Sequence, residues 1–203
     1  MRAVFLAYKA VFKSSEQVVG LLTGLIARLM FFLNDVPVGA GFRSLGIPSL
    51  IVTRRGSFSV GRRFRINNGR RFNVIGRQQP CIFFVEGALR IGDDVGLSGV
   101  AIVCVHAVEI ADGTIIGGNC VIYDTDFHSL RTNDRNHPTL DMRRAKYAKV
   151  SIGRNVFIGA HSTVLKGVKI GDNSVIGACS VVTKEIPSNE IWAGNPAKFI
   201  RRI

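Results

Sequence analysis

The sequence predicts an all-β solenoid, a coiled chain whose turns carry short strands on flat faces. Three observations predict it. Aliphatic residues recur at every sixth position over a long stretch, glycine follows four of six of them, and neither the helical spacing of three and four nor the strand spacing of two fits. The unbroken series is Ile152, Ile158, Val164, Ile170, Ile176 and Val182. Stacked coils would bury these side chains in one continuous column.

Two shorter runs carry the same spacing upstream. They are Val85, Ile91, Leu97 and Val103, then Ile110, Ile116 and Ile122, with one residue inserted between the runs. Ile122 and Ile152 lie thirty residues apart, which is five repeats, so the register survives the long interruption between them. A weaker series at Val60, Ile66 and Phe72 extends the pattern toward residue 50. We therefore expect the solenoid over residues 46–190, with an inserted loop at residues 123–149.

The composition indicates one domain with a strong positive charge. The chain has 203 residues and a formal net charge of +13, and its first hundred residues hold 14 basic and 5 acidic side chains. This excess implies a nucleic acid, an anionic membrane surface, or a phosphorylated or acidic small molecule as partner. The four cysteines form no CxxC pair, which predicts reduced side chains in the cytoplasm rather than disulfides or a zinc ribbon.

Residues 1–45 form a separate helical and apolar segment. Ser14 and Gln17 resemble a helix-capping box, and an apolar run of about 16 residues follows from Val18. The run contains Arg28 and is shorter than the roughly 20 apolar residues of a spanning helix. Two interpretations stay open: the helix lies in a membrane interface, or it caps the main fold or packs on a neighbouring subunit.

The interruption of the repeat carries candidate catalytic residues. It begins with the sequence YDTDFH, which places Asp124, Asp126 and His128 at alternate positions and so on one face of an extended chain. Carboxylates near an imidazole raise its basicity and fix its tautomer, as a general base requires. The alternative is a polar turn with solvated acids and an incidental histidine.

The repeat over residues 85–203 and the run YDTDFHSL together resemble the hexapeptide-repeat acyltransferases, in particular the saccharide O-acetyltransferases of the maltose, galactoside and surface-polysaccharide types. This resemblance implies a left-handed parallel β-helix with three faces, an N-terminal helix, a protruding loop, and a loop and short helix at residues 191–203. It also implies a homotrimer. By the same match, His128 is the catalytic base in a direct transfer through a ternary complex, and Asp126 and Asp124 orient the base or contact the acceptor.

The resemblance implies acetyl-CoA as the donor. The positions that match donor contacts are Ala160, Ala178, Thr183, Lys184, Lys198 and Arg201. Small residues let the pantetheine arm approach the backbone, and cations suit the phosphates of coenzyme A. Alternatively, these residues only serve coil geometry and solubility. We expect no metal, because His106, His128, His137 and His161 lack the spacing of the zinc enzymes that share this fold.

The acceptor site is the least defined part of the sequence. Candidate acceptor-binding residues are Ser98, Arg131, Arg143 and Arg144. Eight further arginines occupy positions 54, 55, 62, 63, 65, 70, 71 and 77. On a solenoid wall they would form a positive band that attracts anionic lipid and keeps the enzyme at the inner face of the cytoplasmic membrane, beside a lipid-linked acceptor; otherwise they are solvated side chains. No signature of a nucleic-acid-binding module accompanies them.

These features together predict an acetyl-CoA-dependent transferase that acetylates a saccharide hydroxyl in bacterial surface polysaccharide or lipopolysaccharide biosynthesis. One alternative is another small hydroxyl or amine acceptor, such as serine, an antibiotic or a nucleotide amino-sugar. The other is a solenoid scaffold without catalysis.

Overall fold

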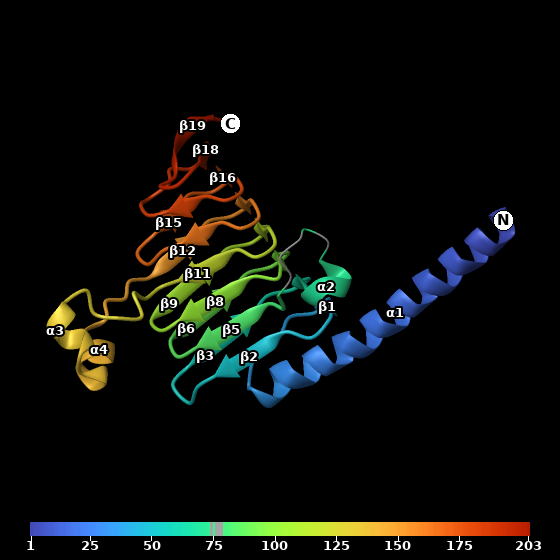
Figure 1. Cartoon of the computed structure of the whole chain (residues 1–203), viewed down its shortest axis with the longest axis horizontal. Coiled ribbons are helices and arrows are strands. Elements are labelled where there is room, and N and C mark those ends of the chain that lie inside the picture. Colours follow the sequence, from blue (N-terminus) through green and yellow to red (C-terminus); the bar gives the residue numbers. More distant parts are fainter. Residues whose placement is uncertain (74, 76–78) are drawn as a thin grey trace.

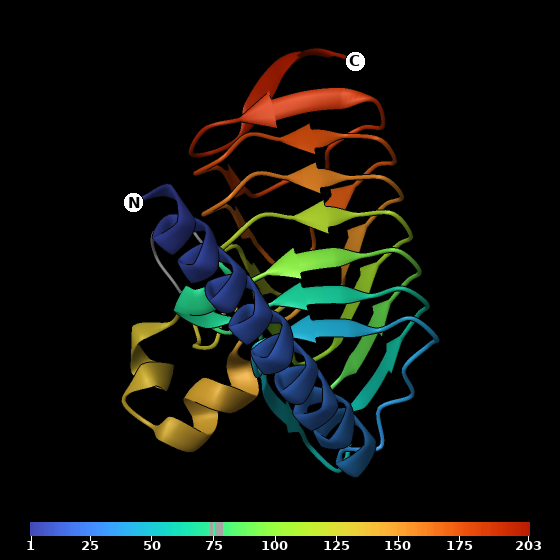
Figure 2. The ribbon, with the colours of Figure 1, turned by 90° about the vertical axis from the view of Figure 1, so that its right-hand side faces the viewer.

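The computed structural model describes residues 1–73, 75 and 79–203, and shows a chain wound into a three-sided coil (Figures 1 and 2). Successive strands go to three parallel sheets in turn, so each strand pairs mainly with the third strand before and after it. Sheet A contains β3 (Ser57–Val60), β6 (Ala88–Ile91), β9 (Ala107–Ile110), β12 (Val150–Ile152) and β15 (Lys169–Ile170). Sheet B contains β1 (Arg43–Leu45), β4 (Arg65–Asn67), β7 (Gly96–Ser98), β10 (Ile115–Ile116), β13 (Phe157–Ile158), β16 (Val175–Ile176), β18 (Glu190–Ala193) and β19 (Lys198–Arg202). Sheet C contains β2 (Ser49–Val52), β5 (Ile82–Val85), β8 (Ala101–Cys104), β11 (Val121–Tyr123), β14 (Thr163–Val164) and β17 (Val181–Val182).

The predicted aliphatic column forms the core of the C-terminal coils. Ile152 pairs with Ile170, and Val164 pairs with Val182, so each coil there advances by 18 residues. All six members of the predicted series are buried. Three hexapeptides therefore make one coil, with one inward aliphatic on each sheet.

The register predicted for the earlier run is wrong at one position, Val103. Val103 is only half-buried, whereas Ile102 and Cys104 point inward and pair with Phe83 and Val85. The coil from Ile91 to its partner Ile110 is 19 residues long, so the extra residue shifts the inward position by one. The weak N-terminal series fails at Phe72, which lies in the short helix α2 (Gly69–Phe72) outside the sheets.

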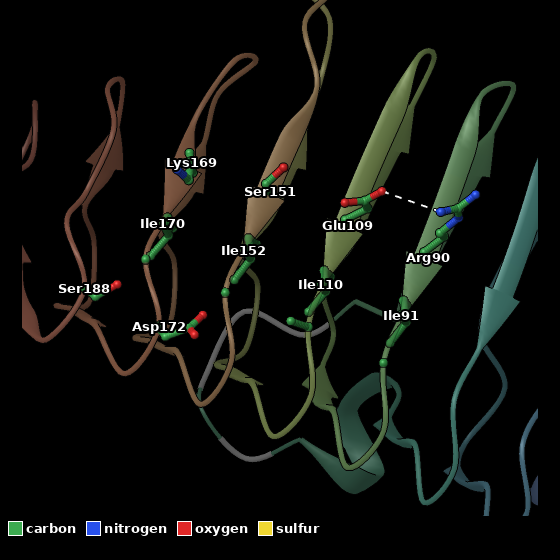
Figure 3. Close-up of a pocket in the computed structure, with 14 residues that line it drawn as sticks. Arg90, Ile91, Glu109, Ile110, Ser151, Ile152, Lys169, Ile170, Asp172 and Ser188 are labelled. Carbon is green, nitrogen blue, oxygen red and sulfur yellow. Dashed lines mark ion pairs between the residues drawn. The ribbon is translucent and has the colours of Figure 1, made fainter.

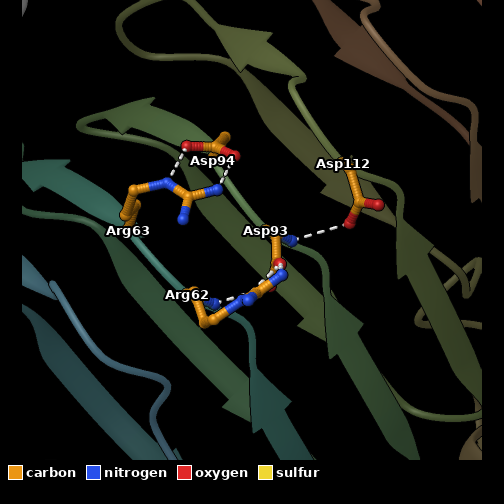
Figure 4. A network of polar contacts seen from close by, with 5 residues as sticks. All are labelled: Arg62, Arg63, Asp93, Asp94 and Asp112. Carbon is orange, nitrogen blue, oxygen red and sulfur yellow. Dashed lines mark hydrogen bonds and ion pairs between the residues drawn. The ribbon is translucent and has the colours of Figure 1, made fainter.

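The glycines that follow the aliphatic residues make room for a polar ladder along the corner between sheets A and B. A Cβ on Gly92 would overlap the carboxylate of Asp112. That carboxylate instead accepts a hydrogen bond from the backbone N–H of Asp93 at 2.7 Å, and Asp93 accepts one from the N–H of Arg62 at 2.7 Å (Figure 4). The coils are thus joined at this corner by side chains as well as by strands.

The N-terminal helix α1 (Arg2–Leu33) is longer than predicted and closes the first end of the coil. It begins at Arg2 rather than at the predicted cap Ser14, because no helix-breaking residue separates the two. Phe31 is fully buried and meets the ring of Phe42 at 5.2 Å and that of Phe58 at 5.7 Å, which confirms that this half of the helix packs on the fold. The other half projects away from the sheets (Figure 1).

Within the described part of the chain, α1 is also the one helix with the length and composition to cross a membrane, although composition alone does not distinguish a spanning helix from other apolar helices.

The C-terminal helix expected at residues 191–203 does not form. Lys198–Arg202 is instead the strand β19, which runs antiparallel to β18 along the end of sheet B. Phe199 packs edge-on against Trp192, with the ring centroids 6.2 Å apart. Pairing with the free edge of β18 supplies the backbone hydrogen bonds that a helix would otherwise make. At the other boundary, β1 begins at Arg43, just inside the segment assigned to residues 1–45.

Candidate active site

The inserted loop leaves sheet C after β11 and carries His128 on its first turn. It protrudes from the coil with two short helices, α3 (Thr132–Arg135) and α4 (Pro138–Arg144) (Figure 1). Phe127 adopts a left-handed backbone conformation with φ of 62°, which turns the chain out of the strand direction. His128 follows with 69% of its side chain exposed.

Asp141 of α4 holds the His128 ring. Its Oδ2 lies 2.6 Å from His128 Nδ1, and its Oδ1 accepts the backbone N–H of Ser129 at 2.7 Å. These two hydrogen bonds lower the pKa of Asp141, so the carboxylate is ionised. An ionised carboxylate at Nδ1 favours the tautomer with its proton there, which leaves Nε2 as a proton acceptor. No hydrogen bond to Nε2 occurs among the described residues.

A second carboxylate stabilises the loop that carries this pair. Asp134 accepts a hydrogen bond from Ser129 Oγ at 2.7 Å and pairs with Arg144 at 2.6 Å. The Ser129 hydroxyl and the Arg144 guanidinium lower the pKa of Asp134. Arg135 donates to the backbone carbonyl of Ser129 at 2.9 Å. The residue after the candidate base is therefore fixed from both sides.

The structure does not place Asp124 or Asp126 against the His128 ring, and their predicted role in orienting the base or contacting the acceptor stays a prediction. Asp124 is fully buried, and its carboxylate accepts three backbone N–H groups, from residues 105, 106 and 107, at 2.7–2.8 Å. Asp126 pairs with Lys166 at 2.7 Å. The alternation fails because β11 ends at Tyr123 and the chain turns before His128. Sequence reasoning missed Asp141, which lies in a stretch without any repeat.

The predicted donor residues lie on two edges of sheet C. Ala160 and Ala178 precede β14 and β17, at the corner with sheet B, where Cys179 N–H donates to Ala160 O at 2.9 Å. Thr183 and Lys184 follow β17, on the edge from which the His128 loop leaves. The other two donor candidates, Lys198 and Arg201, lie on β19 and are exposed. One chain therefore does not bring all the donor candidates together.

Lys184 lies against an aromatic ring. Its Nζ is 5.2 Å from the centroid of Trp192, while the side chain remains exposed. This contact orients the ammonium group at the last coils without neutralising it. A cation held in this way is suited to a phosphate.

The acceptor candidates are also dispersed. Ser98 lies in β7 on sheet B, where it accepts a long hydrogen bond from Asn67 Nδ2 at 3.4 Å. Arg144 is engaged with Asp134, whereas Arg131 and Arg143 are exposed. The loop arginines thus belong to the same inserted loop as His128, and Ser98 does not. Arg77 of the basic stretch lies outside the described residues.

A shallow cavity of about 520 Å³ lies over sheet A, on a face that sequence reasoning did not single out. Four neighbouring strands of sheet A line this cavity, and each contributes one polar side chain: Arg90, Glu109, Ser151 and Lys169 (Figure 3). Glu109 pairs with Lys149 at 2.6 Å and more loosely with Arg90 at 3.9 Å. This lining contains no general base comparable to His128. No group of three or more potential metal ligands occurs within residues 1–73, 75 and 79–203.

The three-sided parallel coil with an exposed, carboxylate-held histidine defines an acyltransferase of the repeat type. The family profile described as bacterial transferase hexapeptide (six repeats) matches residues 149–184. A relative from Escherichia coli K12 that bears the name lipopolysaccharide biosynthesis O-acetyl transferase WbbJ is 34% identical over 150 residues, 72% of each chain. The protein belongs to the hexapeptide-repeat acyltransferase family.

Two further proteins are similar to this chain. Galactoside O-acetyltransferase of Escherichia coli K12 is 37% identical over 130 residues, which is 62% of this chain and 60% of that relative. The solved structure of AntD, an N-acyltransferase from Bacillus cereus in complex with dTDP and 3-hydroxybutyryl-CoA, has a TM-score of 0.65 at 24% identity and covers 82% of each chain. The AntD likeness supports the fold.

Proposed function

We propose that this protein transfers an acetyl group from acetyl-CoA to a saccharide hydroxyl, with His128 as the general base. The contact between His128 Nδ1 and Asp141 Oδ2 at 2.6 Å carries the proposal. This contact orients an exposed histidine whose Nε2 is left as the proton acceptor. The histidine lies on a loop that leaves a coil of the family's fold. The names of the two Escherichia coli relatives support a saccharide acceptor, and the first of them supports an acceptor in lipopolysaccharide biosynthesis.

The proposed reaction is a direct transfer. His128 Nε2 takes the proton of the acceptor hydroxyl as the oxygen forms its bond to the acetyl carbonyl carbon. The carbon–sulfur bond then breaks, and the proton passes from His128 to the departing thiolate. Asp141 stabilises the imidazolium that exists between these two proton transfers. Cys81, Cys104 and Cys120 are buried thiols, which burial holds at raised pKa values of about 12, 12 and 11, so none of these three is a ready nucleophile.

Acetyl-CoA supplies the activated acetyl group, and the residues at the last coils fit it. Ala160 and Ala178 leave the corner between sheets B and C open to a narrow chain, while Lys184, Lys198 and Arg201 offer exposed cations to its phosphates. Thr183 adds a hydroxyl beside Lys184.

We propose further that the coil is left-handed and that the protein is a homotrimer. The separation of the donor candidates over two edges of sheet C supports a trimer, because the edge of one subunit then faces the opposite edge of the next. In that arrangement one site is formed by His128 of one chain and by the corner of a neighbour that carries Ala160 and Ala178, called here the alanine corner. The oligomer size measured by light scattering tests this part.

The decisive experiment measures acetyl transfer from acetyl-CoA to a panel of saccharides that includes galactosides. The assay detects the free coenzyme A thiol that the transfer releases. His128→Ala is expected to abolish turnover and to keep acetyl-CoA binding measured by calorimetry. His137→Ala is the matched control, because His137 is another exposed histidine of the same loop. Equal loss in both variants, or full activity without His128, overturns the proposed base. Absence of acetyl-CoA binding in the folded wild type leaves the scaffold alternative, and transfer only to amines replaces the hydroxyl acceptor.

A further inference from the structure

We infer that α1 docks the protein on an anionic membrane surface, with the helix axis in the plane of that surface. Only one side of the C-terminal half of α1 contacts the coil. A Cβ on Gly20 would lie 2.9 Å from Leu45, and Ala27 and Phe31 are fully buried. The large apolar side chains on the rest of the helix are exposed: Val4, Phe5, Leu6, Tyr8, Val11, Phe12, Val18, Leu21, Leu22, Leu25, Ile26, Leu29, Phe32 and Leu33. An apolar surface of this extent marks an interaction site.

One apolar stripe runs along most of the helix, and the cations near its start lie on the other side. Val4, Val11, Val18 and Leu25 recur every seventh residue and are 54–74% exposed, so they form one apolar stripe. Arg2, Lys9 and Lys13 lie on the opposite side, at helical spacings that continue the line of Gly20 and Phe31. An apolar stripe backed by cations is the pattern of a helix that lies in a membrane interface.

The charge around α1 selects anionic lipid as the partner. The first eighty residues contain 13 basic and two acidic side chains. Arg62 and Arg63 pair with Asp93 and Asp94, and Arg71 pairs with Glu16. Five other arginines on the first two coils are exposed and make no ion pair within the described ranges. They are Arg43, Arg54, Arg55, Arg65 and Arg70. Each such cation near an anionic surface adds to the attraction.

The contacts of α1 favour a helix in the membrane plane over the other occupants. Arg28 donates to the carbonyl of Phe42 at 2.8 Å, and Thr23 accepts the N–H of Gly46 at 3.1 Å, so half of α1 is fixed to the coil and does not leave it to span lipid. A second copy on the same face would bring two cationic surfaces together. Docking on lipid would hold the enzyme beside a membrane-borne acceptor, a role that goes beyond the proposed chemistry.

The test is flotation of the full-length protein with vesicles of phosphatidylcholine alone or mixed with phosphatidylglycerol. Wild type is expected to float with the mixed vesicles and to be released by high salt or alkaline carbonate. Val11→Glu/Val18→Glu, on the apolar stripe, is expected to weaken this partitioning by roughly tenfold or more. Ala10→Glu/Gln17→Glu adds the same charge at the same seven-residue spacing, at exposed positions a quarter-turn around the helix from that stripe, and is expected to retain most of the binding. Lys9→Gln/Lys13→Gln is expected to weaken binding to the mixed vesicles by about fivefold per cation, and to leave binding to phosphatidylcholine vesicles unchanged.

Three outcomes overturn the inference. The first is a wild type that does not bind mixed vesicles. The second is equal binding by the two glutamate pairs. The third is wild type that resists carbonate, which shows a spanning helix. Light scattering on every variant reveals whether the apolar stripe instead joins subunits, because only the stripe variant would then change the oligomer size. Acetyl-CoA binding should be equal in all variants, so failure of docking and failure of the proposed activity are distinguishable.

Discussion

Asp141 lies 13 residues after His128, yet its Oδ2 reaches His128 Nδ1 at 2.6 Å because the inserted loop folds back through α3 and α4. The partner of the base therefore comes from the far end of the loop. The acidic residues just before the base have other contacts.

Asp141→Asn should lower kcat by about 100-fold or more, because a neutral amide neither fixes the productive tautomer nor stabilises the imidazolium. Acetyl-CoA binding should be unchanged. Asp141→Glu should recover part of the rate, and the pH dependence of kcat should move in the Asn variant. Steady-state kinetics with a saccharide acceptor checks this, and an Asn variant with wild-type kcat would show that Asp141 only supports the loop.

Asp124→Ala should unfold more readily, whereas Asp126→Ala should not. Removing the Asp124 carboxylate leaves three backbone N–H groups without their acceptor, and each buried unpaired group costs about 1–3 kcal/mol. The pair between Asp126 and Lys166 is partly exposed and contributes about 0–1 kcal/mol. Urea unfolding measures both. A large loss of kcat in Asp124→Ala at wild-type stability would instead support the role predicted for it at the base.

Acetyl-CoA should protect Cys179 from alkylation. Cys179 is the exposed thiol, next to Ala178 and bonded through its N–H to Ala160 O, whereas Cys81, Cys104 and Cys120 are buried. A maleimide at neutral pH should label one thiol rapidly in the native protein, and Cys179→Ser should remove that phase. If saturating acetyl-CoA leaves the labelling rate unchanged, the alanine corner does not contact the donor.

Gly92→Ala should destabilise the protein by about 1–3 kcal/mol, since its new methyl group would occupy the space of the Asp112 carboxylate. Gly96→Ala is the matched control, because a Cβ there meets nothing within 4 Å, and it should remain within about 1 kcal/mol of wild type. Chemical denaturation compares the two. Equal effects would mean that the polar ladder does not require the glycine.

The Arg62–Asp93 and Arg63–Asp94 pairs should give the protein an acid-labile contribution to stability. Hydrogen bonds from these arginines lower the pKa of Asp93 and Asp94 in the folded state (Figure 4). Their contribution is therefore complete above about pH 4, the usual value of an unfolded carboxyl, and is lost as the pH falls through the lower folded values. Asp93→Asn should flatten the fall in unfolding free energy below that pH. Asp35→Asn, an exposed carboxyl on another segment, should keep the wild-type slope.

The sequence predicts the coil best where every coil has the same length. Ile152, Ile158 and Ile170 are all inward because three hexapeptides close each coil there. Val103 and Cys104 show the limit. Val103 lies six residues after Leu97 and Cys104 lies six residues before Ile110, and only the position of the extra residue in the 19-residue coil decides which of them points inward. Asp141 gave no signal, because loop contacts over a distance in sequence follow no period. The C-terminal helix was predicted from the resemblance alone, and the segment instead forms a strand that pairs with β18.

The two ends of the coil are closed in different ways: Phe31 of α1 fills the first end, and β19 runs antiparallel across the last strand of sheet B. A stack of parallel coils otherwise offers open edges, to which another molecule could add in the same register. The reversal at β19 removes that register at one end, and the helix replaces the strand edge with side chains at the other. The chain therefore covers the first and last parallel strands of sheet B itself, and another coil could add there in register only after one of these two contacts opened.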